Sequence, residues 1–149
     1  MKTTEKVRGT SQDISSKARR IRTFIADDSP FMLVLLSRIL TRDERFTIVG
    51  SATDGVKAFY RASMSHPDLV LMDTHMSGVD GAEVTRWLKQ LKTAPIVFLV
   101  TSDDRPEVRR RSLNAGADAF FLKSDNLAVE LRGAIQKFFP DHLAEKNGQ

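Results

Sequence analysis

The sequence predicts a single α/β domain of five β-α units, and two patterns in the chain lead to this fold class. Short apolar runs of strand length recur along the chain, and segments with the apolar spacing of amphipathic helices separate them. The third to fifth runs are almost continuously apolar, as expected for strands of a parallel sheet with helices on both faces. Right-handed crossovers between such strands produce a doubly wound sandwich.

The five apolar runs are the predicted strands, and each lies close to the usual length of a strand. In chain order they are Ile21–Ala26, Phe46–Ala52, Asp68–Met72, Pro95–Val100 and Ala119–Leu122. The sequence contains no internal repeat, and we expect no second domain after Pro140.

The segments that follow the predicted strands have helical patterns. The first helix begins at Ser29-Pro30, since serine caps helix N-termini and proline fits the first helical position. Pro106–Ala115 is the weakest predicted helix, because it contains three consecutive arginines and few apolar positions. The other helices have apolar side chains at helical spacing: Val56, Phe59, Tyr60 and Met64; Val84, Trp87, Leu88 and Leu91; Leu127, Leu131, Ala134, Ile135 and Phe138.

Length and composition exclude several classes of protein. The 149 residues are enough for one domain with a substantial core. No apolar run approaches the roughly 18 residues that span a bilayer, and the charged N-terminus lacks the apolar segment of a secretory signal. The absence of cysteine excludes disulfides and thiolate chemistry. We therefore expect a cytoplasmic protein that does not associate with membranes.

The net charge of +4 is concentrated at the N-terminus. Residues 1–22 contain seven Lys and Arg against two Asp and Glu, whereas the remainder contains 16 against 17. Because the leading segment is also rich in Ser and Thr and lacks apolar periodicity, we expect residues 1–19 to be a disordered basic arm. Residues 20–140 would form the domain and residues 141–149 a short tail. A basic arm can contact nucleic acid, but a solubilising extension is the simpler interpretation.

Polar residues end four of the predicted strands. Asp27 and Asp28 follow the first strand, Asp73 the third, Thr101 the fourth and Lys123 the fifth. Ligands of open α/β sheets bind beyond the carboxyl ends of the strands, where the strand order reverses. In a flavodoxin-like sandwich with strand order 2-1-3-4-5 this point lies between the first and third strands, so the three aspartates would meet there.

Three converging carboxylates repel one another unless a cation joins them. Magnesium binds a few carboxylate and carbonyl oxygens and bridges to phosphate oxygens, whereas zinc and copper prefer ligands that this chain has in short supply. Lys123 and Thr101 could bind phosphoryl oxygens through an ammonium group and a hydroxyl. The residues alone leave open whether phosphate is a bound ligand or a covalent adduct, although an aspartate in these surroundings is equipped for in-line attack on phosphorus.

Together these residues resemble bacterial response-regulator receiver domains. The matching features are the Asp27-Asp28 pair, Asp73 within the segment Leu69–Gly81, Thr101 and Lys123. Each feature alone is weak, but the set is specific because all of them follow or end strands in the family's order. The resemblance covers about Arg20 to Phe139 and is closest to stand-alone, chemotaxis-regulator-like receivers.

The resemblance implies a magnesium-dependent phosphoacceptor site. Asp73 would accept the phosphoryl group, Asp28 would bind magnesium directly, and Asp27 would assist directly or through water. The backbone carbonyl of His75 would complete the protein ligands, so its side chain need not touch the metal. The phosphodonor would be a histidine kinase or a histidine phosphotransfer protein of a two-component phosphorelay.

The resemblance also implies a switch. Thr101 and Lys123 would contact the phosphoryl oxygens, and Phe120 stands where the family has its aromatic switch residue. The signal would leave through the face formed by the helix near Pro106–Ala115, the strand Ala119–Leu122 and the last helix. We expect no DNA-binding domain, so output would be partner binding or phosphate relay. A monomer and a phosphorylation-dependent dimer are both compatible with the sequence.

The chain departs from the family pattern at a few positions. Ser124 follows the lysine where proline with a cis bond is common, which leaves the geometry of the Lys123–Ser124 bond open. Ser77 replaces a frequent proline, and Phe120 lacks the hydroxyl of a tyrosine switch. His75 and Asp103 lie beside the expected path of the attacking water, and we expect them to tune the lifetime of the phosphoryl group.

Two other functions compete with this interpretation. A metal-assisted phosphatase with an aspartyl nucleophile usually has a second aspartate two residues later, where this chain has His75. A degenerate receiver would bind partners without phosphorylation, but such proteins commonly lose one of the five site residues. We therefore expect no enzymatic turnover beyond self-catalysed phosphorylation and dephosphorylation. Separately, Phe31–Leu36 is apolar all round its helix, which fits either a docking patch for the phosphodonor or simple burial.

Overall fold

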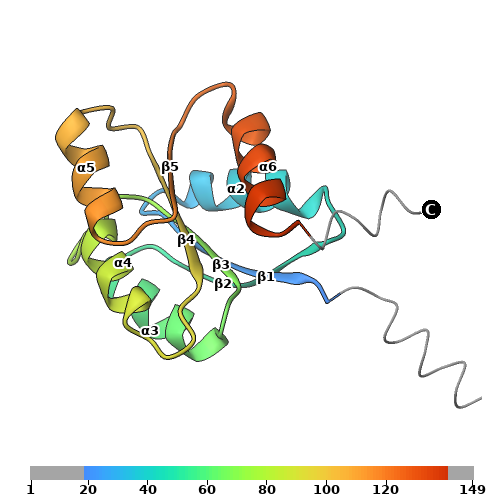
Figure 1. The fold of residues 1–149 in the computed structure, drawn as a ribbon, viewed down its shortest axis with the longest axis horizontal. Coiled ribbons are helices and arrows are strands. Elements are labelled where there is room, and N and C mark those ends of the chain that lie inside the picture. Colours follow the sequence, from blue (N-terminus) through green and yellow to red (C-terminus); the bar gives the residue numbers. More distant parts are fainter. Residues whose placement is uncertain (1–18, 141–149) are drawn as a thin grey trace, which may run out of the picture.

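A computed structural model describes residues 19–140 and has the predicted α/β sandwich. Five parallel strands form one sheet in the order β2-β1-β3-β4-β5, which confirms the flavodoxin-like order (Figure 1). The strands are β1 (Ile21–Ala26), β2 (Phe46–Ala52), β3 (Leu69–Met72), β4 (Ile96–Thr101) and β5 (Ala119–Leu122). The helices are α2 (Pro30–Thr41), α3 (Gly55–Ser65), α4 (Gly81–Lys89), α5 (Pro106–Asn114) and α6 (Leu127–Phe138).

The predicted elements are confirmed with small shifts at their ends. The strand β3 begins one residue later than expected, and β4 extends to Thr101, so this threonine is the last residue of a strand. Ser29 caps α2 as predicted, since its side-chain oxygen accepts a hydrogen bond from the Met32 N–H. Of the predicted basic arm only Arg19 is described; the rest of the arm and the tail 141–149 lie outside the described residues.

Two apolar clusters lie on opposite faces of the sheet, as a doubly wound sandwich requires. Helices α2 and α6 cover one face with Leu36, Leu131 and Ile135. Helices α3 and α4 cover the other face, where Ala62 and Leu88 are buried. None of the helices in residues 19–140 is long and apolar enough to cross a membrane.

The buried face of α3 is not the one that its large apolar residues suggest. Val56, Tyr60 and Met64 are exposed, whereas Ala58 and Ala62 are almost completely buried. Small side chains let the helix axis approach the sheet closely, so the large apolar side chains lie on the outside. The helix itself was predicted correctly, but its apolar spacing does not identify the face that packs on the sheet.

Candidate functional site

The sheet order brings the predicted site residues to one edge. The last residues of β1 and β3, Ala26 and Met72, are paired across the sheet, so Asp27 and Asp73 follow neighbouring strands at the same level. On the other side of β3, Thr101 is paired with Leu122 of β5, and Lys123 follows directly. The carboxyl ends of four strands therefore supply one crevice.

The three predicted aspartates form one acidic cluster. One carboxylate oxygen of each of Asp27, Asp28 and Asp73 lies within 4.8 Å of the other two. Asp27 is completely buried, Asp73 is 5% exposed, and Asp28 is exposed at the mouth. Backbone N–H groups hold the buried pair in position: Ser29 donates to Asp27 Oδ1 at 2.9 Å and His75 to Asp73 Oδ1 at 3.2 Å. The open corner of the cluster is therefore on the side of Asp28.

Lys123 is the cation that the described residues bring to this cluster. Its Nζ lies 3.0 Å from Asp73 Oδ2, to which it donates a hydrogen bond, and 2.8 Å from Asp27 Oδ2. Burial lowers the pKa of Lys123, but the close contacts with the Asp27 and Asp73 carboxylates outweigh it and hold the pKa above its ordinary value. Lys123 is therefore fully protonated at neutral pH.

Lys123 lies close to Asp27, but the contact leaves one carboxylate oxygen of Asp27 without a hydrogen bond. Although the distance is that of an ion pair, Asp27 Oδ2 is buried without a donor in hydrogen-bond geometry. The pair is therefore an ionic contact and not a directed hydrogen bond. A buried carboxylate oxygen in this state is stabilised by a further cation or a water molecule.

The chemistry of this donor set suits a hard divalent cation. All three side chains offer carboxylate oxygens, which magnesium prefers. The three carboxylate oxygens lie within 4.8 Å of one another, so one cation could be held by all of them, directly or through water.

Thr101 lies beside the cluster, and a residue that sequence reasoning missed is its partner. The Thr101 hydroxyl is buried and accepts a hydrogen bond from the Thr74 hydroxyl at 2.7 Å and another from the Asp103 N–H at 3.1 Å. Thr74 follows Asp73 directly and is 4% exposed. Its sequence position beside Asp73 was a signal, but a lone threonine does not show which way its side chain points.

The loop after Asp73 is packed tightly against the starts of two helices. A Cβ atom on Gly81, the first residue of α4, would lie 2.1 Å from the Asp73 carbonyl oxygen. A Cβ atom on Gly55, the first residue of α3, would lie 1.8 Å from the Val79 carbonyl oxygen. Both helices therefore begin on the segment that carries Asp73, and only glycine permits these approaches.

A bridge of side chains begins at His75, whose backbone N–H binds Asp73. The ring nitrogen Nε2 of His75 lies 2.7 Å from Asp103 Oδ2, and Arg105 donates two side-chain N–H groups to the same carboxylate. The hydrogen bonds from Arg105 and then His75 hold the pKa of the Asp103 carboxyl well below its usual range. His75 and Asp103 thus link the loops after β3 and β4.

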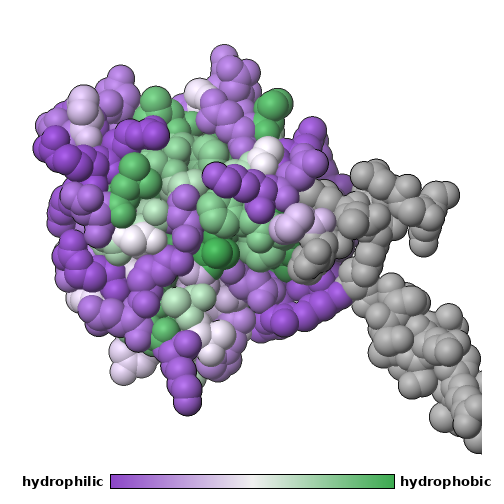
Figure 2. All heavy atoms as spheres, in the orientation of Figure 1, coloured by the Kyte–Doolittle hydropathy of each residue, from purple (hydrophilic) through white to green (hydrophobic). Residues whose placement is uncertain are grey.

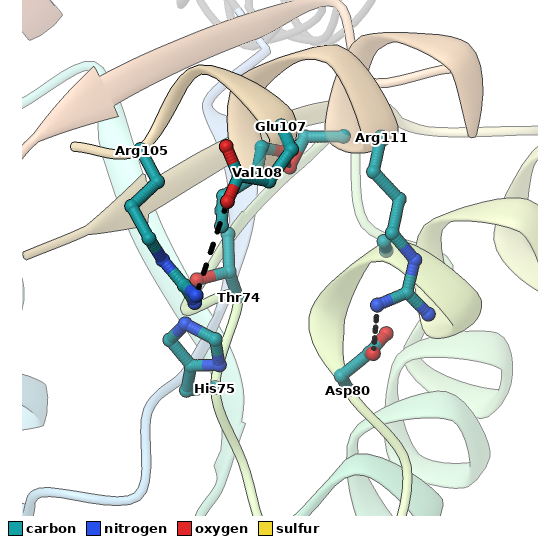
Figure 3. A pocket seen from close by; sticks show the side chains of 9 residues that line it. Thr74, His75, Asp80, Arg105, Glu107, Val108 and Arg111 are labelled. Carbon is teal, nitrogen blue, oxygen red and sulfur yellow. Dashed lines mark hydrogen bonds and ion pairs between the residues drawn. The ribbon is translucent and has the colours of Figure 1, made fainter. Parts of the chain in front are cut away.

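A separate pocket of about 220 Å³ lies between α4 and α5, next to this bridge (Figure 3). Thr74 and His75 line it, but the three aspartates do not. Arg111 of α5 forms an ion pair with Asp80 at 2.7 Å. Asp80 also caps α4 through the Glu83 N–H, so one carboxylate connects both helices.

Two further predicted positions are defined by the structure. Phe120 is half-buried, and the guanidinium carbon of Arg109 lies 5.7 Å from the centre of its ring. The Lys123–Ser124 peptide bond is trans, like every peptide bond among residues 19–140. Serine is therefore accommodated after Lys123 without the cis geometry that is common in the family.

Comparisons with known proteins agree on one family. Residues 23–136 match the response regulator receiver domain. Over 105 residues, 69% of the chain, it is 35% identical to a protein-glutamate methylesterase/protein-glutamine glutaminase from Methanospirillum hungatei, of which it covers 30%. It spans about half the length of the transcriptional-regulator relatives it matches.

Solved structures give the same result. The response regulator domain of Thermotoga maritima CheB superimposes with a TM-score of 0.73 at 29% identity, covering 80% of this chain and 96% of that one. A CheY-like response regulator receiver domain protein from Methanospirillum hungatei has a TM-score of 0.73 at 25% identity, covering 85% of this chain and 98% of that one.

Proposed function

The chain belongs to the response regulator receiver domain family, and on this premise we propose that Asp73 accepts a phosphoryl group from a phosphohistidine of a histidine kinase or histidine phosphotransfer protein. One observation carries the proposal: Asp73 lies in a cluster with Asp27 and Asp28 and accepts a hydrogen bond from Lys123. Residues 20–140 would be the unit that performs this reaction. Receiver domains act as phosphoacceptors in two-component signalling, so the family supports the same assignment.

The proposed transfer joins an Asp73 carboxylate oxygen to phosphorus while the bond from phosphorus to the histidine nitrogen breaks. Magnesium held by Asp27, Asp28, Asp73 and the His75 backbone carbonyl would supply positive charge to the phosphoryl oxygens. Lys123 already donates a hydrogen bond to Asp73 Oδ2. Its ammonium group is therefore positioned to bind a phosphoryl oxygen when the phosphoryl group reaches Asp73. The carboxylates need no proton transfer to react, since Asp73 attacks as an anion.

The proposed readout begins at Thr101. Its hydroxyl oxygen accepts hydrogen bonds from the Thr74 hydroxyl and the Asp103 N–H, so its own O–H is available to donate to a phosphoryl oxygen once the side chain moves toward Asp73. The movement would vacate space for Phe120, which must also leave its contact with Arg109. The protein would thus have two arrangements of Thr101 and Phe120. Phosphorylation shifts the population toward one of them only as far as the phosphoryl group interacts more favourably with that arrangement than with the other.

The face that would report this change is apolar. Figure 2 shows hydrophobic side chains gathered over β5 between α5 and α6. Leu113 of α5, Leu122 of β5 and Val129 of α6 are large apolar residues with 39–67% of their surface exposed. We propose this face as the output surface for a target protein, with phosphate relay as the other form of output. A monomer and a phosphorylation-dependent dimer are both consistent with it, and we place the reaction in the cytoplasm.

The start of α2 is proposed as the docking patch for the phosphodonor. Phe31 is 73% exposed and Val34 52% exposed, whereas Leu36 is buried, so part of the apolar run is free to contact a partner. These side chains begin directly after Asp28 and the cap Ser29, at the edge where phosphate arrives. An apolar patch beside the acceptor suits a helical partner that presents a phosphohistidine.

The proposed function is tested by transfer from a phosphorylated histidine phosphotransfer domain, followed by gel-resolved radiolabel, in the native chain and in the Phe31→Asp variant. We expect Phe31→Asp to slow this transfer at least about tenfold while labelling by acetyl phosphate stays unchanged. Tyr60→Asp, an equally exposed site on α3, is the matched control and should transfer normally. Equal loss with both donors would refute docking at α2, and labelling that survives Asp73→Asn would refute the acceptor assignment.

A further inference from the structure

An apolar stripe on α3 has no part in the phosphoacceptor site or the proposed output face. Val56, Tyr60 and Met64 lie at i, i+4 and i+8, on one side of the helix, and they are 50%, 69% and 74% exposed. Single exposed apolar residues are ordinary on protein surfaces. Three in one row, in a helix that buries alanines instead, form a continuous surface that suits contact with another molecule.

The stripe borders a groove between α3 and α4. The groove has a volume of about 430 Å³ and is lined by Val56, Phe59, Tyr60, Ser63 and Trp87. Phe59 and Trp87 are half-buried, with ring centres 5.4 Å apart, and join the two helices. Aromatic residues and methionine are enriched where proteins bind one another, because they supply large contact areas at small entropic cost.

Cationic side chains flank the stripe. Lys57 and Arg61 are exposed and lie at i and i+4, in a row beside Tyr60 and Met64. Arg86 of α4 is exposed next to Trp87. The nearby acids, Asp54 and Glu83, already contact Lys57 at 3.9 Å and Arg86 at 3.0 Å. The border of the groove therefore carries one excess positive charge, that of Arg61, whose guanidinium also donates to the Ser51 carbonyl at 2.9 Å.

We propose that the α3–α4 groove binds an acidic amphipathic helix of a partner protein. A helix with its own apolar row would fill the groove between Tyr60 and Trp87, and acidic side chains beside that row would face Lys57 and Arg61. The concave, aromatic floor favours a helix over a flat lipid surface. This contact goes beyond the phosphotransfer and output surfaces, which lie on other helices.

The groove is connected to the phosphoacceptor loop through backbone contacts. Gly55 begins α3 and donates its N–H to the Ser77 carbonyl at 3.2 Å, while Gly81 begins α4 and donates to the Thr74 carbonyl at 2.8 Å. Both acceptors lie in the segment that follows Asp73. A partner that clamps α3 against α4 therefore contacts the two helices that hold this segment.

The experiment uses a displayed library of helical peptides, selected on the full chain and counter-selected on the Tyr60→Glu, Met64→Glu double variant. Binding of enriched peptides is then measured by the fluorescence of Trp87, which lies in the groove and is the only tryptophan of the 149 residues. Thr41→Glu, at an exposed site at the end of α2, is the control, and thermal melts check that each variant is folded.

We expect enriched peptides to be acidic, with apolar residues at i and i+4, and to change the Trp87 emission. The Tyr60→Glu, Met64→Glu variant should weaken binding at least about tenfold, as expected for the loss of central anchors, and Thr41→Glu should leave binding unchanged. A second variant that carries both Lys57→Glu and Arg61→Glu should bind basic peptides in preference to acidic ones. Added salt should weaken binding, since the flanking charges are exposed.

Several results would overturn the proposal. These are the absence of enriched peptides, enriched peptides without net negative charge, or equal binding to the double variant. If sedimentation shows that the native chain is a dimer and the Tyr60→Glu, Met64→Glu variant a monomer, the groove would be assigned to a second copy of the chain. If anionic phosphatidylserine vesicles change the Trp87 emission and the same variant loses this change, the groove would be assigned to a membrane surface instead.

Discussion

The side chains of His75 and Asp103 connect the loops that follow Asp73 and Thr101. His75 and Asp103 meet at 2.7 Å, and their backbone N–H groups bond to Asp73 and Thr101. The hydrogen bonds from Arg105 and then His75 lower the pKa of Asp103, so this carboxyl stays charged well below neutral pH. We expect a bridge in this position to restrict the water that would hydrolyse an aspartyl phosphate.

Removing the bridge is therefore expected to shorten the lifetime of the phosphoryl group. In Asp103→Ala, and to a smaller degree in His75→Ala, dephosphorylation should become roughly fivefold faster, which corresponds to about 1 kcal/mol in the barrier. The measurement is the decay of label after the donor is removed. Asp104→Ala, which changes the neighbouring exposed carboxylate, is the control. Unchanged decay in both site variants would contradict this role.

The exposed member of the acidic cluster is predicted to oppose stability until a cation binds. Asp28→Asn removes one of three carboxylates within 4.8 Å. It should raise the free energy of unfolding without metal by about 1 kcal/mol, the Coulomb value for such a separation in water. In the native chain magnesium should add stability, about 2.7 kcal/mol at one hundred times its Kd, and the variant should lose most of this gain.

Urea unfolding with and without magnesium measures both effects. Glu44→Gln, an exposed carboxylate between α2 and β2, should change neither value appreciably. A full magnesium gain in Asp28→Asn would show that Asp28 does not bind the metal.

At this scale the sequence predicted which residues meet, but not all their contacts. Asp27, Asp28, Asp73, Thr101 and Lys123 were identifiable because each follows or ends a strand. Thr74 and Arg105 were not, because their importance depends on side-chain direction. The direction of Thr74 is fixed by a tertiary contact with the Thr101 hydroxyl, and that of Arg105 by the carboxylate of Asp103, two residues earlier in the loop.

Among the elements, α3 and α4 show where the sequence pattern succeeds and fails. The apolar spacing predicted both helices, and Val84 and Leu88 of α4 are buried as an apolar stripe should be. In α3 the stripe of Val56, Tyr60 and Met64 faces outward. The periodicity of apolar residues identifies a helix. Which of its sides packs on the sheet depends on how closely the helix axis must approach the sheet.

The start of α4 is predicted to set the position of Asp73. Gly81→Ala would place a Cβ atom 2.1 Å from the Asp73 carbonyl oxygen, so the acceptor loop must shift. We expect a loss of about 1–3 kcal/mol in stability, typical of overpacking, together with slower labelling by acetyl phosphate. Both are measurable on one preparation by urea unfolding and intact mass.

Gly133→Ala provides the matched comparison, because a Cβ atom there meets nothing within 4 Å. It lies within α6 and should stabilise the chain by about 0.5–1 kcal/mol, the usual gain of alanine over glycine in a helix. A Gly81→Ala variant that behaves like Gly133→Ala would contradict the packing argument.

For the whole molecule, parallel topology explains why distant residues form one site. Five strands in the order β2-β1-β3-β4-β5 place the carboxyl ends of β1 and β3 side by side, and Lys123 reaches both aspartates from beyond β5. This arrangement was predictable from strand spacing and crossover rules. The exposed groove between α3 and α4 was not, because it depends on which helix faces remain uncovered.

The central claim, magnesium-dependent phosphorylation of Asp73, is tested most directly by intact mass after incubation with acetyl phosphate. The account predicts a gain of one phosphoryl group that requires magnesium, disappears with a chelator and is absent in Asp73→Asn. Circular dichroism would establish that the variant is folded. A gain that persists in Asp73→Asn, or that forms equally well without magnesium, would contradict the account.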